Sequence, residues 1–414
     1  MLSLLRRNRD FRTVFTAQVI SYMGDWFATV AVLGVVLDLT DSGFAAAMVF
    51  VAQSLPAFFV TPLAGTVADR FDRRKVLVLA SSVQALAALG FLLIAPGRVW
   101  MAYVAQGTIS LLGAFFAPAS NAALPNIVDK NDLPLATALM ASTWGAMLAI
   151  GAALGAAFTI VFGRDASFIA DAVSFAVAGA LIFSVRRPMR EPGTEPDRSR
   201  RMRPLDDTAD ALRYAWHRPQ VLALLGSKAG FGLGTGVVGL LAVLATQTFN
   251  SGDRGTGLLL TMRGLGVVAG PLLANRVARR GVHGLLLACG VASIVYGVAY
   301  GFVPFAPGIG AAAILVLIAH LGGGCQWTFS TYGLQVVTPD ALRGRIFAAD
   351  FALVTVSMSI SLALAGWLSG TIGVGPTMVG LACIEIAWGV LYLAITKTLR
   401  APDESLIATP VAAD

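Results

Sequence analysis

Charged residues are scarce in this 414-residue chain. Asp, Glu, Lys and Arg together make up 13% of the residues, whereas hydrophobic residues make up 57%. A soluble domain carries roughly 25% charged residues, so this chain has too little polar surface to cover a water-soluble core. The deficit excludes an ordinary soluble globular protein and indicates a membrane protein.

Cysteine and histidine are equally rare, with three residues of each. Cys289, Cys325 and Cys383 all lie within apolar runs, where a thiol packs as a small apolar side chain. The histidines show no zinc-ligand spacing, so we expect neither a disulfide framework nor a metal site. The sequence also shows no glycine-rich phosphate-binding loop and no nucleophile–base constellation. We therefore expect that the protein is not an enzyme and binds no cofactor. Because nothing in the sequence suggests ATP hydrolysis, any energy that the protein uses would have to come from an ion gradient.

Long apolar runs are what the sequence has in abundance. A helix that crosses a bilayer needs about 20 apolar residues. Only helices and closed barrels satisfy every backbone polar group in lipid, and these runs are too long for barrel strands. The sequence therefore predicts an all-α polytopic membrane protein with twelve transmembrane helices. The predicted spans are residues 13–37, 45–68, 76–95, 99–120, 136–161, 168–185, 221–248, 256–275, 284–305, 309–336, 346–368 and 376–396.

Basic residues are distributed unevenly between the two sets of loops. Lys and Arg favour the cytoplasmic side of a membrane. If the N-terminus is cytoplasmic, 25 of the 30 basic residues are cytoplasmic, and only Arg98, Arg164 and Arg254 fall in outer loops. This asymmetry predicts a multi-pass protein of the plasma (inner) membrane with both termini in the cytoplasm. Because the basic excess follows loop parity along the whole chain, it predicts no nucleic-acid partner.

The second half of the chain repeats the first with a shift of 209 residues. Under this shift "DSG" at 41–43 aligns with "NSG" at 250–252, and Pro62 aligns with Pro271. The repeat predicts two pseudo-symmetric halves of six helices each.

The domain boundaries follow from this repeat. The longest loop is crowded with Arg, Pro, Glu and Asp, and it contains the spacing of a short helix that lies either on the inner membrane surface or in solution. The predicted parts are an N-terminal half (1–185), a cytoplasmic linker (186–218), a C-terminal half (219–396) and a disordered cytoplasmic tail (397–414).

A dense charged turn, "GTVADRFDRRK" at 65–75, separates the second and third predicted spans. This turn resembles the signature of the loop between helices 2 and 3 in the major facilitator superfamily. The two predicted halves of six helices each also resemble the fold of that superfamily. The resemblance implies that Asp69 and Arg73 grip the second half of the protein in one conformation, whereas a purely topogenic basic loop is the alternative. The residues assigned to this conformational motif are Gly65, Asp69, Arg70, Arg73 and Arg74, with Arg343 and Arg345 of the later string "PDALRGRIFA" (339–348).

Longer strings narrow the resemblance to one branch of the superfamily. "FFAPASNAALPNIVDKNDLPLATAL" (115–139), "FIADAVSF" (168–175) and "PDALRGRIFA" resemble the macrolide-efflux and enterobactin-exporter-like group. The resemblance implies a monomeric secondary transporter that exports amphipathic small molecules, drug- or siderophore-like, by alternating access with H⁺ antiport. Its partners would be a small-molecule substrate, protons and the lipid bilayer. A proton-coupled importer, a lipid transporter and a non-transporting receptor or scaffold are the alternatives.

A carboxylate near the middle of the first predicted span is the leading candidate for ion coupling. Gln18, Tyr22, Asp25 and Thr29 follow one another at helical spacing and form one polar stripe. A polar stripe that faced lipid would be costly, so we expect it to face a central cavity. Asp25 would then exchange a proton or bind a cationic substrate, or alternatively support the backbone around Gly24.

The other charged residues within predicted spans have weaker cases. Glu385 is a second candidate for coupling, although a structural ion pair is favoured there. Asp171 and Asp350 lie near the ends of predicted spans and are expected at the membrane interface. Lys228 either snorkels to water or serves as the counter-charge of Asp25. The residues predicted to line the substrate cavity are Gln18, Tyr22, Trp26, Thr29, Phe115, Trp144, Lys228, Gln326, Trp327 and Tyr332.

Overall fold

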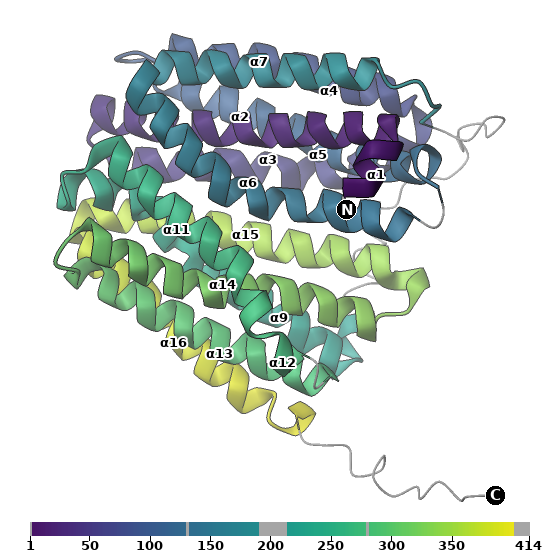
Figure 1. The fold of residues 1–414 in the computed structure, drawn as a ribbon. Coiled ribbons are helices and arrows are strands. Elements are labelled where there is room, and N and C mark those ends of the chain that lie inside the picture. Colours follow the sequence, from purple (N-terminus) through teal and green to yellow (C-terminus); the bar gives the residue numbers. More distant parts are fainter. Residues whose placement is uncertain (1, 130–131, 190–212, 279–280, 401–414) are drawn as a thin grey trace, which may run out of the picture.

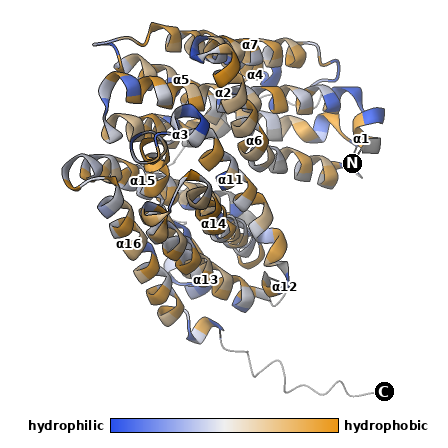
Figure 2. Cartoon of the chain, turned by 60° about the vertical axis from the view of Figure 1, so that its left-hand side comes forward, coloured by the Kyte–Doolittle hydropathy of each residue, from blue (hydrophilic) through white to orange (hydrophobic). Residues whose placement is uncertain are grey.

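A computed structural model describes residues 2–129, 132–189, 213–278 and 281–400 of the chain. It contains twelve helices that are long and apolar enough to cross a membrane, as the sequence predicts. Within the described ranges no residue lies in a β-strand. Hydrophobic residues run along the helices, and hydrophilic residues gather at their ends and turns (Figure 2).

Six spanning helices make up the N-terminal half (Figure 1). Polar side chains begin several of them: the side chain of Asn8 accepts the N–H of Phe11, and that of Asp72 accepts the N–H of Lys75. The elements are α1 (Leu2–Arg7), α2 (Arg9–Thr40), α3 (Gly43–Arg70), α4 (Arg73–Leu89), the 3₁₀ turn η1 (Gly90–Leu93), α5 (Trp100–Ile127), α6 (Leu133–Phe162) and α7 (Arg164–Phe183).

Six further spans make up the C-terminal half. The first of them changes from α to 3₁₀ and then to π geometry. The elements are α9 (Pro219–Gly234), η2 (Thr235–Leu240), α10 (Leu241–Val243), η3 (Leu244–Thr248), α11 (Gly252–Leu273), α12 (Asn275–Ala278), α13 (Gly281–Phe302), η4 (Val303–Phe305), α14 (Ile309–Val337), α15 (Asp340–Ile372), α16 (Val374–Ile395) and η5 (Thr398–Arg400).

The backbone repeats the pattern seen in the sequence. Asp41 and Asn250, which follow the first span of each half, both have φ of 49°. Gly163 and Gly373, which precede the last span of each half, have φ of 88° and 89°. Such left-handed conformations are uncommon outside glycine and a few short polar residues. Their recurrence at matching places indicates that the two halves are built on one template.

The bundle has two different ends. With twelve crossings, α1 and η5 lie at the same end, which we call the terminal end; the turns at Asp41, Gly163, Asn250 and Gly373 lie at the other, which we call the distal end. In Figure 1 the distal end is on the left, and α1 and α12 mark the terminal end on the right.

The apolar core is continuous at the distal end and divided at the terminal end. One buried cluster contains Val30 and Ala46 of the N-terminal half together with Val237 and Leu362 of the C-terminal half. Toward the terminal end, a second cluster holds residues of the N-terminal half alone, and a third holds residues of the C-terminal half alone. The halves therefore share a core near the distal end and pack separately near the terminal end.

Most of the predicted linker and tail, residues 190–212 and 401–414, lies outside the described residues. Residues 213–216 are helical at the end of the linker, and Trp216 there is 74% exposed. The interfacial helix and the division into domains thus stay predictions.

Candidate functional site

Two carboxylic acids lie together between the first and last helices of the N-terminal half. Asp25 on α2 is partly buried, and Asp171 on α7 is completely buried. A Cβ atom at Gly24 would lie only 2.8 Å from Oδ1 of Asp171. The absent side chain of Gly24 therefore lets α7 bring Asp171 against α2 at the residue that precedes Asp25.

Asp171 corrects a prediction from the sequence, which placed it at the membrane interface. The helix α7 begins at Arg164, earlier than the predicted start at 168, so Asp171 lies about two turns inside the helix. Neither of its carboxyl oxygens has a hydrogen-bond partner among the described residues. A buried polar group without a partner is costly, which makes this position unusual.

The rest of the stripe on α2 divides into packing residues and partly open ones. Gln18 is buried and donates a hydrogen bond of 2.9 Å from Nε2 to the carbonyl oxygen of Met140 on α6. The hydroxyl of Thr29 donates to the carbonyl oxygen of Asp25 at 2.7 Å. Trp26 is buried, and a Cβ at Gly151 of α6 would lie 3.1 Å from its side chain. Tyr22, like Asp25, is only partly buried.

A second polar cluster joins three helices of the C-terminal half. Nζ of Lys228 on α9 lies 2.5 Å from Oδ2 of Asp350 on α15, and it donates to Oγ1 of Thr331 on α14 at 2.9 Å. The ammonium also lies 4.6 Å from the ring centroid of Trp327. Both charged side chains are almost fully buried, at 3% and 6% exposure. Lys228 therefore neither snorkels nor pairs with Asp25, and Asp350 is a buried partner of Lys228; whether it lies at the depth of the membrane interface stays a prediction.

Glu385 on α16 is completely buried, and its two carboxyl oxygens have no hydrogen-bond partner among the described residues. The ion pair favoured for it from the sequence is absent from that part of the chain. Its carboxyl packs against Gly234, where a Cβ would collide with Oε2. Glu385, on the last helix of the C-terminal half, thus packs against Gly234 on the first helix of the same half.

The remaining predicted cavity residues differ in exposure. Gln326 is completely buried, and its amide donates to the carbonyl oxygen of Ser227 at 2.7 Å, so it holds α14 to α9. Phe115 is partly buried. Trp144, Trp327 and Tyr332 are the most exposed of the predicted cavity residues, at 46%, 40% and 51%.

The charged turn between α3 and α4 is anchored within the N-terminal half. Arg73 donates to the carbonyl oxygens of Ala122 and Met189 at 2.8 and 3.0 Å, and Arg74 donates to that of Arg187 at 3.0 Å. The side chains of Gly65, Asp69 and Arg70 lie outside those that the structure describes. Arg343 and Arg345 lie in the first two turns of α15 and are partly buried. A grip on the second half stays a prediction.

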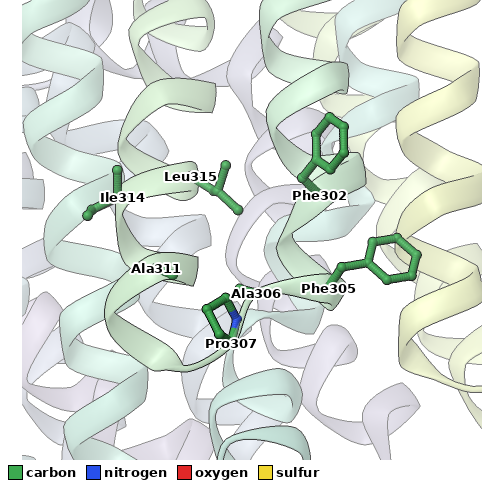
Figure 3. Close-up of a pocket in the computed structure, with 7 residues that line it drawn as sticks. All are labelled: Phe302, Phe305, Ala306, Pro307, Ala311, Ile314 and Leu315. Carbon is green, nitrogen blue, oxygen red and sulfur yellow. The ribbon is translucent and has the colours of Figure 1, made fainter.

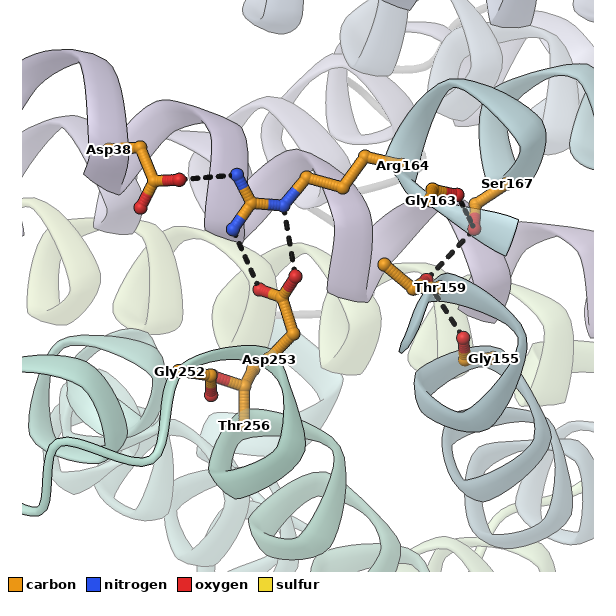
Figure 4. Close-up of polar contacts among 9 residues, drawn as sticks. All are labelled: Asp38, Gly155, Thr159, Gly163, Arg164, Ser167, Gly252, Asp253 and Thr256. Atoms are coloured by element: carbon orange, nitrogen blue, oxygen red, sulfur yellow. Dashed lines mark hydrogen bonds and ion pairs between the residues drawn. The ribbon is translucent and has the colours of Figure 1, made fainter. Parts of the chain in front are cut away.

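Sequence reasoning missed a cluster of charges that joins the halves at the distal end (Figure 4). Nε and Nη2 of Arg164 donate to the two carboxyl oxygens of Asp253 at 2.9 and 3.1 Å, and Nη1 donates to Asp38 at 2.5 Å. We call Arg164, Asp38 and Asp253 the distal latch. A Cβ at Gly34 would collide with Asp253 and Arg164, so this glycine leaves room for the latch. From the sequence, Arg164 was counted only as an outer-loop cation, since its partners are distant in the chain.

An apolar hollow also lies at the distal end of α13 and α14 (Figure 3). It contains none of the predicted site residues, which places it apart from both polar clusters. It is lined by Phe302, Phe305, Ala306, Pro307, Ala311, Ile314 and Leu315.

Known proteins resemble this chain over nearly its whole length. A family model described as transmembrane secretion effector, within the major facilitator superfamily (MFS), matches residues 2–410. The uncharacterized MFS-type transporter YfiS of Bacillus subtilis is 24% identical, with 94% of each chain covered. The multidrug efflux pump Tap of Mycobacterium tuberculosis is 25% identical, with 92% of each chain covered.

Solved structures share the fold at low sequence identity. A POT family transporter in complex with 5-aminolevulinic acid matches with a TM-score of 0.79 and 10% identity, over 95% of this chain and 97% of that chain. A bacterial homolog of the human lysosomal transporter Spinster, in an inward-facing conformation, matches with a TM-score of 0.71 and 13% identity over the same shares. The fold agrees with these comparisons, since the structure has twelve membrane-spanning helices in two similar halves and the family model matches nearly the whole chain. The chain belongs to the transmembrane secretion effector family of the major facilitator superfamily and is a multi-pass membrane transporter, not an enzyme.

Proposed function

We propose that this transporter exports amphipathic small molecules by alternating access and takes up protons in exchange. The observation that carries the proposal is the unequal packing of the two halves. They share one apolar core and the latch at the distal end, whereas the cores near the terminal end are separate. Alternating access requires a bundle whose halves can close at one end while they part at the other.

Several further contacts between the halves support closure at the distal end. The side-chain amide of Gln247 donates to Oδ1 of Asp41 at 2.8 Å. A Cβ at Gly366 on α15 would lie 2.8 Å from Cα of Phe44 on α3, so the two backbones approach closely. Such small-residue contacts are typical of helix pairs that pack tightly in membranes.

The orientation in the membrane is part of the proposal. The excess of Lys and Arg favours cytoplasmic termini in the plasma membrane, so the terminal end would face the cytoplasm. Separate cores at that end would then correspond to an inward-facing state, which accepts substrate from the cytoplasm. The name of the relative Tap supports the outward direction of transport. We expect a monomer, since each copy contains both halves.

Proton coupling is assigned to Asp25, with Glu385 as a second candidate. Burial in a medium of low dielectric disfavours a charged carboxylate, so an acid that alternates between two environments can take up and release a proton. Asp25 is only partly buried and lies on the same face as the partly buried Tyr22. Glu385 is completely buried, which leaves it without the same contact to solvent.

Flux in inside-out membrane vesicles tests the proposal. Export with proton exchange predicts that a labelled amphipathic cation such as ethidium accumulates in vesicles whose lumen is acidic. Asp25→Asn should abolish this accumulation and retain exchange of the compound down its own gradient, because Asn cannot gain or lose a proton. Asp165→Asn, which removes an exposed carboxylate of α7, is the matched control. Accumulation in right-side-out vesicles with an acidic exterior would instead establish an importer.

A further inference from the structure

The completely buried Asp171 has no role in the mechanism described so far. It lies against Gly24, one residue from Asp25, and the two carboxyls are close enough for their charges to interact. Its carboxyl oxygens have no hydrogen-bond partner in the described part of the chain. The side chain of Ser174 also packs against Gly24. The hydroxyl of Ser174 donates to the backbone carbonyl of Asp171 at 2.7 Å.

Among the residues that the structure describes, the helices around this pair place no cation at its depth. Helices α5 and α6 contain no charged residue at all. The cations of α4 lie in its first turn, and those of α2 and α7 lie near the ends of these helices. On α11, Arg263 has Tyr296, Tyr300 and His320 of the C-terminal half as its neighbours. Tyr22 is a further titratable group beside Asp25.

Two ionised carboxylates without a cation would repel each other strongly in this apolar setting. A single proton on either acid removes one of the charges and with it the repulsion. We propose that Asp25 and Asp171 form one proton-binding site, in which the two acids share one proton: it resides on one carboxyl while the other is ionised, and they are coupled through their charges rather than through a direct hydrogen bond. The site rests on the proposed proton coupling and adds a second carboxyl to it. Asp25, the partly buried member, exchanges the proton with its surroundings, and Asp171 is its completely buried partner.

The C-terminal half provides an internal comparison. Gly234 and Glu385 repeat the arrangement of Gly24 and Asp171, an acid of the last helix against a glycine of the first. The residue after Gly234 is Thr235, whereas the residue after Gly24 is Asp25. The second carboxyl is therefore present in only one half, so only the N-terminal half can share a proton in this way.

Infrared spectroscopy of the purified full-length protein tests the pair without any transported compound. The carbonyl stretch of protonated carboxylic acids is followed while the pH is varied, and Glu385→Gln identifies the band of the buried acid on α16. In a shared site, Asp25→Asn alters the band of Asp171, and Asp171→Asn alters the band of Asp25. We expect the midpoint of each remaining acid to move by about one pH unit or more. Asp165→Asn should leave every such band unchanged.

Gly24→Ala keeps both acids but forces them apart, since the added methyl collides with Ser174 and Asp171. This variant should shift the carbonyl bands of both Asp25 and Asp171. It keeps the test valid if an Asp171 variant fails to fold. If the band of each acid is unchanged when the other acid is replaced, the shared site is overturned. Coupled bands in a protein whose transport ignores pH gradients would instead refute the proposed proton coupling. A band that responds to Na⁺ and not to pH would make the site a sodium site and overturn the inference.

Discussion

Removal of the distal latch should move the transporter toward the state that is open at the distal end. Arg164 is the only member that contacts both others, because its guanidinium binds Asp253 through two hydrogen bonds and Asp38 through a third. Arg164→Ala removes all three. Arg164→Lys retains the charge but not the planar fork that fits a carboxylate, so it should have an intermediate effect.

The size of the shift follows from the exposure of the three side chains. Arg164 and Asp253 are 25% and 19% exposed, whereas Asp38 is 57% exposed. The exposed pair contributes little, since surface ion pairs are worth about 0–1 kcal/mol. The pair of Arg164 and Asp253 is half-buried and bidentate, so its free-energy contribution should exceed that of a surface ion pair. It should stay below the roughly 1.5–3 kcal/mol of a charge-assisted hydrogen bond in a buried site. A total of about 1–2 kcal/mol corresponds to roughly a 5–30-fold change in the ratio of the two states.

Electron spin resonance between two labels measures this ratio directly. Asp165→Cys and Arg254→Cys are exposed positions on opposite halves of the distal end, and their distance should lengthen when that end opens. Arg98→Ala removes an exposed cation of the same end and is the matched control. An unchanged distance distribution in Arg164→Ala would refute the reasoning that the latch holds the halves together. The labels require a background in which Cys289, Cys325 and Cys383 are replaced.

Three further predictions concern other parts of the molecule. Lys228→Met should destabilise the detergent-solubilised protein by about 3–5 kcal/mol, because it leaves Asp350 buried without its partner, and Asp350→Leu in the same chain should restore most of the loss in a denaturation experiment. Asp69→Asn should lower the transport rate and leave binding of the compound within a few fold; unchanged rates would reduce the charged turn to a topogenic role. A cysteine at Thr40 should react with an impermeant reagent from outside intact cells, and one at Thr194 only in opened cells; the reverse pattern would invert the orientation.

The number and order of the helices were predictable because membrane helices are marked by hydropathy alone. Twelve apolar runs became twelve helices, and the shift of 209 residues reappears in the equal φ values of Asp41 and Asn250. The ends of the helices were less predictable. A charged first turn such as that of α7 belongs to the helix but not to the apolar run, and this displaced Asp171 in the prediction.

Contacts between distant helices could not be predicted in the same way. Lys228 was compared with Asp25 because both lie in repeat-equivalent helices, yet its partner is Asp350, which is 122 residues away. Which faces of two helices meet depends on small residues such as Gly24 and Gly34, whose importance is visible only once the neighbouring side chains are in place.

The shared core at the distal end also has a consequence for biogenesis. The N-terminal half can complete its own core near the terminal end as soon as it has been synthesised. Its distal face, by contrast, includes Ala149 and Ala156 of α6, which are covered by Gly264 and Gly257 of α11. Until α11 has been inserted, this small-residue face is open to lipid or to insertion factors. The nascent first half is therefore an incomplete folding unit, whose last contacts form only when the second half docks onto it.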